Sequence, residues 1–203
     1  MVITHRSIRI GVMGTHSTGK TLLLRRIERE LFARDITVAR TGQLGRRAAL
    51  VPLPKMMHHT ADSTRWVIAT GIADEVAAAA RPVGDTSVQV VLADRACWDA
   101  IGYFRAAQEW SGRTTHRTER EALHQLAAAN PPYDLLLTTV LDPHLPVRRK
   151  HDYDPRYRQL VDHHTHALLR EENLPHLRVT SDETSRQHAI DRAVELCLTE
   201  TPV

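Results

Sequence analysis

The sequence predicts an α/β fold of three layers, in which a sheet of five parallel strands carries helices on both faces. Apolar runs of strand length alternate with longer segments of helical period through the whole chain, and this alternation is typical of βαβ units. Residues 88–93 form an apolar run, as expected for a parallel strand buried on both faces. The 203 residues contain no repeat and no long linker, so we expect a single domain over 1–203.

The N-terminal half begins with an expected strand at residues 8–13. A helix is expected at 21–33, because its apolar residues recur on one helical face. A short second strand is expected at 36–39. The alanine-rich segment 62–81 predicts a long helix, which ends where Pro82 removes a backbone donor.

The C-terminal half continues the alternation, with strands expected at 135–141 and 177–180. A helix at 98–110 should end before Gly112, since glycine commonly follows the last helical residue. Three further helix starts are expected from capping signals, which are Thr118 with Glu121, Asp154 with Pro155, and Thr184 with Gln187. The first of these helices should end before Asn130, and the second should run to about Glu171.

The composition is that of an ordinary globular protein, with 42% apolar and 25% charged residues. A net charge of +3 is too small to indicate nucleic-acid binding without a clustered patch. Cys97 and Cys197 lie far apart, which predicts two reduced thiols. The sequence has neither an apolar run of transmembrane length nor a signal-peptide h-region. We therefore expect a cytoplasmic protein without nucleic-acid or membrane partners.

A phosphate-binding motif follows the first strand. The segment GTHSTGKT matches the P-loop pattern G-x-x-x-x-G-K-[ST], and its residues are Gly14, Thr15, His16, Ser17, Thr18, Gly19, Lys20 and Thr21. Such a loop turns backbone N–H groups toward phosphate oxygens, which the N-terminus of the next helix also attracts. Lys20 would reach the β- and γ-phosphates, and the Thr21 hydroxyl would bind Mg²⁺. A chance match arises in roughly one chain in a hundred, and the flanking strand and helix favour ATP with Mg²⁺, with GTP less favoured.

Asp94 and Arg95 follow the apolar run at 88–93, at the sheet edge where open α/β folds bind ligands. A carboxylate there can hold Mg²⁺ through water or accept the proton of an attacking hydroxyl. Arg95 suits an anionic substrate group or the transferring phosphoryl, and the alternative is a solvated Asp–Arg pair. Asp99 either hydrogen-bonds the substrate or caps the following helix.

Residues 142–153 combine prolines with positive charge and are expected to form a loop, which together with the start of the next helix gives a dense basic segment at 142–158. Its arginine and lysine residues are Arg148, Arg149, Lys150, Arg156 and Arg158. Phosphoryl transfer depends on positioning and charge stabilisation, so this basic segment is a candidate lid, with a solvated charged loop as the alternative. The histidines do not favour a metal site: His163 and His166 could meet on a helix, but no acidic partner is evident.

Taken together, the P-loop, the Asp94–Arg95 pair and the basic loop resemble small P-loop kinases over nearly the whole chain. The resemblance is to the AAA-like ATP-binding group related to the nicotinamide riboside kinase domain of bacterial NAD regulators, and more distantly to thymidylate and deoxynucleoside kinases. It implies the P-loop nucleoside-triphosphate hydrolase fold. It also implies that Asp94 acts as base or Mg²⁺ ligand, and that Arg148 and Arg149, or Arg156 and Arg158, close over the migrating phosphoryl group.

The resemblance also bears on the acceptor. The related domains often carry Glu-x-x-Arg after the second strand, where this chain has Gln43-Leu44-Gly45-Arg46. Arg46 therefore matches a substrate ligand, whereas the acid is missing. Arg65 would face the acceptor from the long helix unless it merely packs. Arg186 could stack on the adenine from the last helix, and a plain surface arginine is the alternative.

These features predict an ATP- and Mg²⁺-dependent kinase that transfers the γ-phosphoryl group to a hydroxyl of a small, nucleoside-like acceptor. The predicted catalytic residues are Lys20, Asp94, Arg148 and Arg149. The alternative is a regulatory ATP-binding or ATPase switch without an acceptor. No N-K-x-D motif is present, which argues against a GTP switch. The sequence does not name the acceptor, and it leaves a homodimer open.

Overall fold

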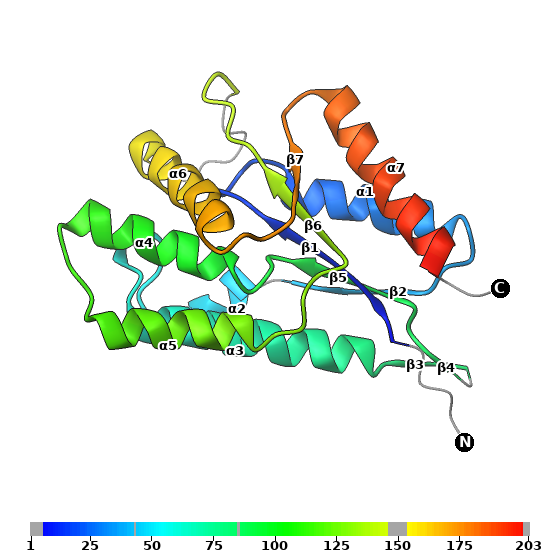
Figure 1. The fold of residues 1–203 in the computed structure, drawn as a ribbon, viewed down its shortest axis with the longest axis horizontal. Helices are drawn as coiled ribbons and strands as arrows, with labels where there is room; N and C mark the ends of the chain where they lie inside the picture. Colours follow the sequence, from blue (N-terminus) through cyan, green and yellow to red (C-terminus); the bar gives the residue numbers. More distant parts are fainter. Residues whose placement is uncertain (1–5, 43, 85, 146–153, 201–203) are drawn as a thin grey trace.

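The computed structural model of the chain describes residues 6–42, 44–84, 86–145 and 154–200, without the side chains of residues 46 and 49. Its main sheet has five parallel strands in the order β2-β5-β1-β6-β7 (Figure 1). Their bounds are β1 (Ile8–Met13), β2 (Val38–Thr41), β5 (Val90–Asp94), β6 (Leu135–Thr139) and β7 (Leu177–Val179). The predicted parallel sheet of five strands is therefore confirmed.

Helices cover both faces of this sheet, as the three-layer prediction requires. On one face lie α1 (Lys20–Phe32) and α7 (Glu183–Glu200), and on the other lie α3 (Ala61–Ala79), α4 (Asp99–Ser111), α5 (Arg117–Ala128) and α6 (Pro155–Glu171) (Figure 1). Strand β1 contributes Ile10 and Val12 to the first apolar layer and Met13 to the second. Burial on both faces explains why β1 is apolar without alternation.

Strand β1 lies at the centre of the sheet, and its end defines the position of the P-loop. Val12 is in register with Asp94 of β5, and Met13 is in register with Thr138 of β6. The carboxyl ends of these three parallel strands therefore meet at one edge. The segment that leaves β1 there lies between Asp94 and Thr139, at the edge where open α/β sheets bind ligands.

Several short elements were not predicted from the sequence. They are α2 (Leu44–Leu50), the 3₁₀ helix η1 (Met56–His58), and a hairpin of β3 (Pro82–Val83) and β4 (Thr86–Ser87). Elements of one or two turns, or of two residues per strand, are too short to show a hydrophobic period. They occur in the connections on either side of α3.

The capping predictions have mixed outcomes. Asp154 caps α6 as expected, because its carboxylate accepts hydrogen bonds from the N–H groups of Arg156 (2.8 Å) and Tyr157 (3.3 Å). The predicted caps at Thr118 and Thr184 are wrong, since both residues lie inside their helices. A cap must stand just outside the first turn to reach its free N–H groups, and these helices begin earlier than expected.

The capping box of α3 was not predicted from the sequence. The Thr60 hydroxyl accepts a hydrogen bond from the Ser63 N–H, and the Ser63 hydroxyl accepts one from the Thr60 N–H. Serine in place of the usual Glu or Gln at the third position hides this box from the sequence pattern.

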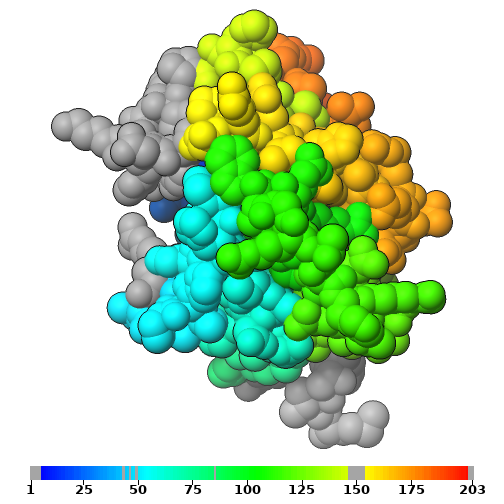
Figure 2. Space-filling model, turned by 90° about the vertical axis from the view of Figure 1, so that its left-hand side faces the viewer, coloured from blue at the N-terminus to red at the C-terminus, as the bar shows by residue number. Residues whose placement is uncertain are grey.

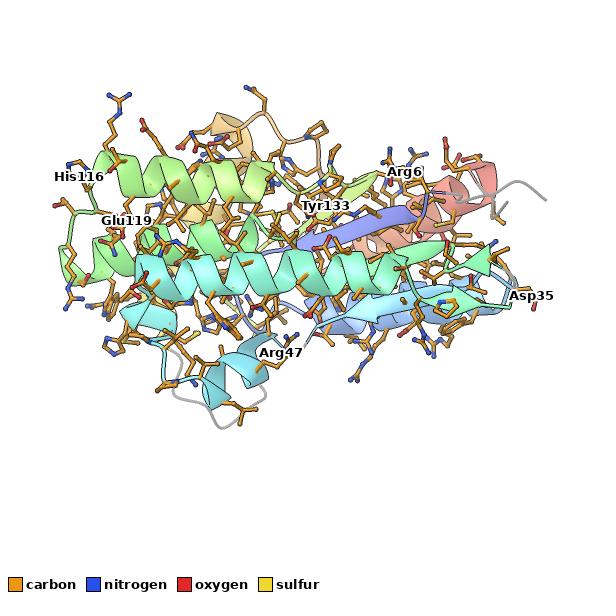
Figure 3. All side chains as sticks on the ribbon, turned by 90° about the horizontal axis from the view of Figure 1, so that it is seen from below. Arg6, Asp35, Arg47, His116, Glu119 and Tyr133 are labelled. Carbon is orange, nitrogen blue, oxygen red and sulfur yellow. The ribbon has the colours of Figure 1, made fainter. Side chains whose placement is uncertain are left out.

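A buried charged network joins β1 to α3 and to the loop after α5. The Arg9 guanidinium pairs with Glu75, donates to Asn130 Oδ1 at 2.8 Å, and stands 5.2 Å from the centre of the Tyr133 ring. The Tyr133 hydroxyl donates to the other Glu75 oxygen at 2.8 Å. Figure 3 shows α3 and α5 side by side, with Tyr133 just beyond α5 and next to β1. Gly11 allows this approach, because a Cβ there would lie 2.8 Å from the Tyr133 ring.

We expect Glu75→Ala to lower the free energy of unfolding by about 3–5 kcal/mol, because it leaves the buried Arg9 cation without its carboxylate. Denaturant unfolding measures the change. Glu121→Ala, which breaks the exposed pair with Arg117, should cost below about 1 kcal/mol. Equal losses in the two variants would contradict the role of this network.

Candidate functional site

The loop between β1 and α1 contains three residues in the left-handed region, with φ of +132° at Gly14, +60° at Ser17 and +91° at Gly19. Gly14 also lies against β6, because a Cβ there would come within 2.2 Å of the Thr139 hydroxyl oxygen. The same hydroxyl lies 2.6 Å from the hydroxyl oxygen of Thr18. Glycine at position 14 therefore lets the loop close tightly on the sheet.

The Lys20 side chain is buried inside this loop. Its ammonium donates hydrogen bonds to the carbonyl oxygens of Gly14 (2.7 Å) and Thr15 (2.5 Å). Burial, with the nearby Arg95 guanidinium, lowers the pKa of Lys20 to about 7, although Asp99 and Asp94 oppose that shift. The loop thus encloses a cation whose charge has little compensation from the protein.

Thr21 and Asp94 meet at the start of α1. The Thr21 hydroxyl donates to Asp94 Oδ2 at 2.7 Å. Gly42, at the end of β2, leaves the carboxylate space on its other side, since a Cβ there would lie 3.3 Å from the Asp94 Cβ. A hydroxyl and a carboxylate beside a phosphate-binding loop form a donor set that fits Mg²⁺, which takes one or two protein oxygens together with water and phosphate oxygens.

Asp99 joins the P-loop to Arg95 through hydrogen bonds. Its carboxylate is almost fully buried, and Oδ1 accepts a hydrogen bond from the Gly14 N–H at 2.9 Å. Oδ2 accepts one from Arg95 at 2.6 Å. The Arg95 guanidinium in turn stands 4.9 Å from the centre of the Tyr103 ring. Both oxygens of Asp99 are thus engaged by the protein, one at the P-loop and one at Arg95.

His16 is the second residue of the motif after Gly14, and aromatic side chains from α4 and α6 surround it. Its ring centre lies 6.2 Å from that of Tyr103 and 6.5 Å from that of Tyr157, and His59 packs on Tyr103 at 6.4 Å. Figure 2 shows the face where η1 (cyan), α4 (green) and α6 (yellow to orange) come together. Burial, with the charges of Lys20, Arg158 and Arg95, lowers the pKa of His16 to about 3, so the ring is neutral.

Arg158 extends from the first turns of α6 toward the same loop. It is buried, with 7% of its surface exposed, and lies close enough to lower the pKa of both His16 and Lys20. Within the described ranges it has no carboxylate partner, and its Nε atom has no hydrogen-bond partner. A buried guanidinium without an anion is unfavourable, so the geometry favours an anionic ligand at this position.

A family model described as an AAA domain matches residues 9–186 of the chain. The chain belongs to this AAA domain family. Among curated proteins, none matches it. The family assignment agrees with the P-loop nucleotide-binding fold and with the resemblance inferred from the sequence.

Two solved structures of NadR protein share the fold of this AAA domain. One is a complex with NR, at a TM-score of 0.63 and 21% identity over 95% of the present chain. The other is a complex with NAD and AMP-PNP, at a TM-score of 0.59 and 22% identity over 98% of the present chain. The AAA domain spans about half of each NadR chain, which is 51% in both comparisons. In the described part of the domain, no helix is both long and apolar enough to span a membrane.

The other predicted site residues differ in whether they lie next to the P-loop. A guanidinium nitrogen of Arg186 lies 3.9 Å from where a Cβ on Gly19 would stand, so this side chain borders the P-loop. Arg65 is half exposed and pairs with Asp62 one turn away on α3. The side chain of Arg46 lies outside the described residues, as do Arg148 and Arg149.

Thr139 and Tyr157 were missed as site residues. The polar pair of threonines that ends the apolar strand β6 is a signal for the first, because it stands at the ligand-binding edge. Tyr157 carries no comparable signal, since its contact with His16 depends on how α6 packs against α4.

We expect Lys20 to titrate near pH 7, against 10.5 for an ordinary lysine, because its ammonium is desolvated next to Arg95. The chain has three lysines, Lys20, Lys55 and Lys150, so ¹³C-lysine labelling gives few signals in an NMR titration. Lys20→Arg identifies the signal by its loss. Since the protonated ammonium is the form that attracts phosphate, anion affinity should fall as pH rises through 7. A Lys20 signal that moves only in the ordinary lysine range would contradict this expectation.

Proposed function

We propose that this protein is an ATP- and Mg²⁺-dependent kinase that transfers the γ-phosphoryl group to a hydroxyl of a small acceptor, with nucleoside-like compounds as the first class. The observation that carries the proposal is Arg158, a buried cation without a carboxylate partner among the described residues, next to Lys20 of the P-loop. Binding a nucleotide needs the loop and Lys20. A further buried guanidinium beside them suits the charge that develops on a migrating phosphoryl group.

The charge balance around the loop supports this role for Arg158. Two guanidinium groups, those of Arg95 and Arg158, act on Lys20, and the carboxylate that accepts a hydrogen bond from Arg95 is Asp99, which is shared with the Gly14 N–H. A phosphate group supplies the missing negative charge. Arg158 is held by a helix whose first turn is capped by Asp154, so the guanidinium is positioned before the ligand arrives, which lowers the reorganisation that catalysis needs.

The remaining roles follow from the positions of the polar groups. Lys20 and the backbone N–H groups of the loop hold the β- and γ-phosphates. Thr21 and Asp94 would hold Mg²⁺, which, when bound, neutralises charge on the phosphate oxygens. Within the described residues, Oδ1 of Asp94 accepts no hydrogen bond, whereas Oδ2 accepts one from Thr21. Oδ1 is therefore available to accept the proton of the acceptor hydroxyl.

In the proposed transfer, the acceptor oxygen forms a bond to the γ-phosphorus while the bond to the β,γ-bridging oxygen breaks. The hydroxyl proton passes to Asp94, and ADP carries away the electron pair of the broken bond. The NadR structure bound to AMP-PNP supports an adenine nucleotide for the present chain. Arg186, beside Gly19, would contact that nucleotide from α7.

An ATP-consumption screen tests the function. The acceptor classes are nucleosides, nucleotides, sugars and natural-product alcohols, each assayed with Mg²⁺ and with the Lys20→Ala variant as the inactive control. We expect ADP release that depends on one acceptor class and disappears in the variant. ATP hydrolysis that no acceptor stimulates would instead support the regulatory ATPase.

We expect Asp94→Asn to reduce the transfer rate by about 10²-fold or more while changing ATP affinity little, because the amide cannot accept the hydroxyl proton as a carboxylate does. Single-turnover kinetics and equilibrium binding of an ATP analogue separate these effects. A normal rate at saturating Mg²⁺, with weakened Mg²⁺ affinity, would make Asp94 a metal ligand only.

We expect Arg158→Gln to reduce the transfer rate by about 10²-fold or more, since one charge-assisted contact to the phosphoryl group is lost. Arg120→Gln is the control, because Arg120 is an exposed arginine on α5 to which no role in the reaction is assigned. Initial rates at saturating ATP and acceptor measure both variants. Equal losses, or no loss in Arg158→Gln, would remove Arg158 from the reaction.

A further inference from the structure

A second polar cavity lies at the edge of the sheet, between α6 and β7. Its volume is about 490 Å³. The residues that line it are Leu141, Pro143, Gln159, Asp162, His163, His166, Arg170, His176 and Arg178. None of them belongs to the P-loop motif or to the Asp94–Asp99 segment. The cavity is therefore a different place on the molecule from the proposed nucleotide site.

The fold explains why basic side chains gather there. Leu177 and Val179 of β7 face the apolar layer under α1 and α7, so alternation along the strand turns Arg178 toward the layer of α6. On α6, Asp162, His166 and Arg170 recur every four residues and therefore share one side of the helix. The opposite side packs through Val161 and Leu168 into the core.

The charges in this cavity are mostly positive. Within the described residues, neither Arg170 nor Arg178 forms an ion pair with a carboxylate. Asp162 is the one carboxylate in the lining, and it accepts a hydrogen bond from the Leu141 N–H at 2.9 Å. Its oxygen lies 3.7 Å from the His166 Nε2 atom. Two guanidinium groups thus face a cavity with one acid that already has a partner.

Three imidazoles, those of His163, His166 and His176, line the same cavity. His176 Nδ1 lies 2.8 Å from the Leu174 carbonyl, so this nitrogen is the donor of that contact. Burial, with the charges of Arg178, His176 and Arg170, lowers the pKa of His166, while Asp162 opposes the shift. Burial is the largest cause of this shift, and Arg170 and Arg178 act in the same direction.

A metal ion does not suit this cluster of histidines. Across the described parts of the chain, no group of three His, Cys, Asp or Glu side chains is placed to hold a metal. Asp162 supplies the acidic neighbour of His166 that the sequence did not show, yet the two arginines would repel a cation. Guanidinium groups instead bind phosphate through paired N–H donors.

We propose that the cavity between α6 and β7 binds a small phosphate-bearing anion through Arg170, Arg178 and the histidines beside them. Its volume lies within the range of small-molecule sites, of roughly 300–1,000 Å³, and its concave shape selects against an extended macromolecule. Two unpaired guanidinium groups match a ligand with at least two negative charges. This site does not depend on the proposed kinase activity.

Pyrophosphate binding to the full chain tests the proposal, measured by isothermal titration at constant ionic strength. The P-loop also attracts this probe, so the titration is repeated with Lys20→Ala, which weakens the P-loop and leaves the cavity intact. The test variant combines Arg170→Gln with Arg178→Gln, and the two single variants are measured beside it. Arg120→Gln is the matched control, since it removes one exposed arginine from α5, which does not line the cavity.

We expect Lys20→Ala to retain one pyrophosphate site. Adding the double substitution should weaken that site by at least about tenfold, each single substitution should account for part of the loss, and Arg120→Gln should leave affinity within about twofold. Pyrophosphate should also shift the His176 imidazole signals in ¹⁵N NMR spectra. Loss of all binding in Lys20→Ala, an unchanged affinity in the double variant, or an equal loss in Arg120→Gln would each overturn the proposal.

Discussion

The buried Asp99 carboxylate is the interaction on which the candidate site depends. It accepts hydrogen bonds from the Gly14 N–H and from Arg95, and so joins the start of the P-loop, the end of β5 and the first turn of α4. Arg95 has a φ of +99°, a conformation that costs a non-glycine residue of order 1–3 kcal/mol. The ion pair and the contact with Tyr103 hold it there. Removing the carboxylate would leave the partly buried Arg95 cation unpaired and release the loop from α4.

Around this anchor, the loop is prepared for a multivalent anion. Three cationic side chains, Lys20, Arg95 and Arg158, outnumber the two carboxylates near Lys20, which are Asp94 and Asp99. The lowered pKa values of Lys20 and His16 have the same cause, which is burial next to other cations. The ammonium of Lys20 donates hydrogen bonds to loop carbonyls, and the Thr21 hydroxyl donates one to Asp94.

Helix α6 connects the two basic regions of the molecule. Its first turns bring Arg158 to the P-loop, while Arg170, about 18 Å further along the helix axis, lines the cavity beside β7. Val161 and Leu168 hold its opposite side in the core next to α4. One helix therefore fixes the positions of a buried cation, Arg158, beside the P-loop and of an exposed cation, Arg170, at the sheet edge.

The sequence by itself determined the fold class, the P-loop and the place of Asp94, because strand–helix alternation, the GTHSTGKT pattern and an acid after an apolar run are all local signals. It could not determine the partners of Asp99, since these depend on Gly14, which lies 85 positions away. The same holds for Arg158, which the sequence assigned to a candidate lid at the start of a helix and which the packing of α6 buries near His16. The short elements α2, η1 and β3–β4 could not be predicted either, because they are too short to show a hydrophobic period. Periodicity arises within a segment, whereas burial and hydrogen-bond partners arise only when distant segments pack together.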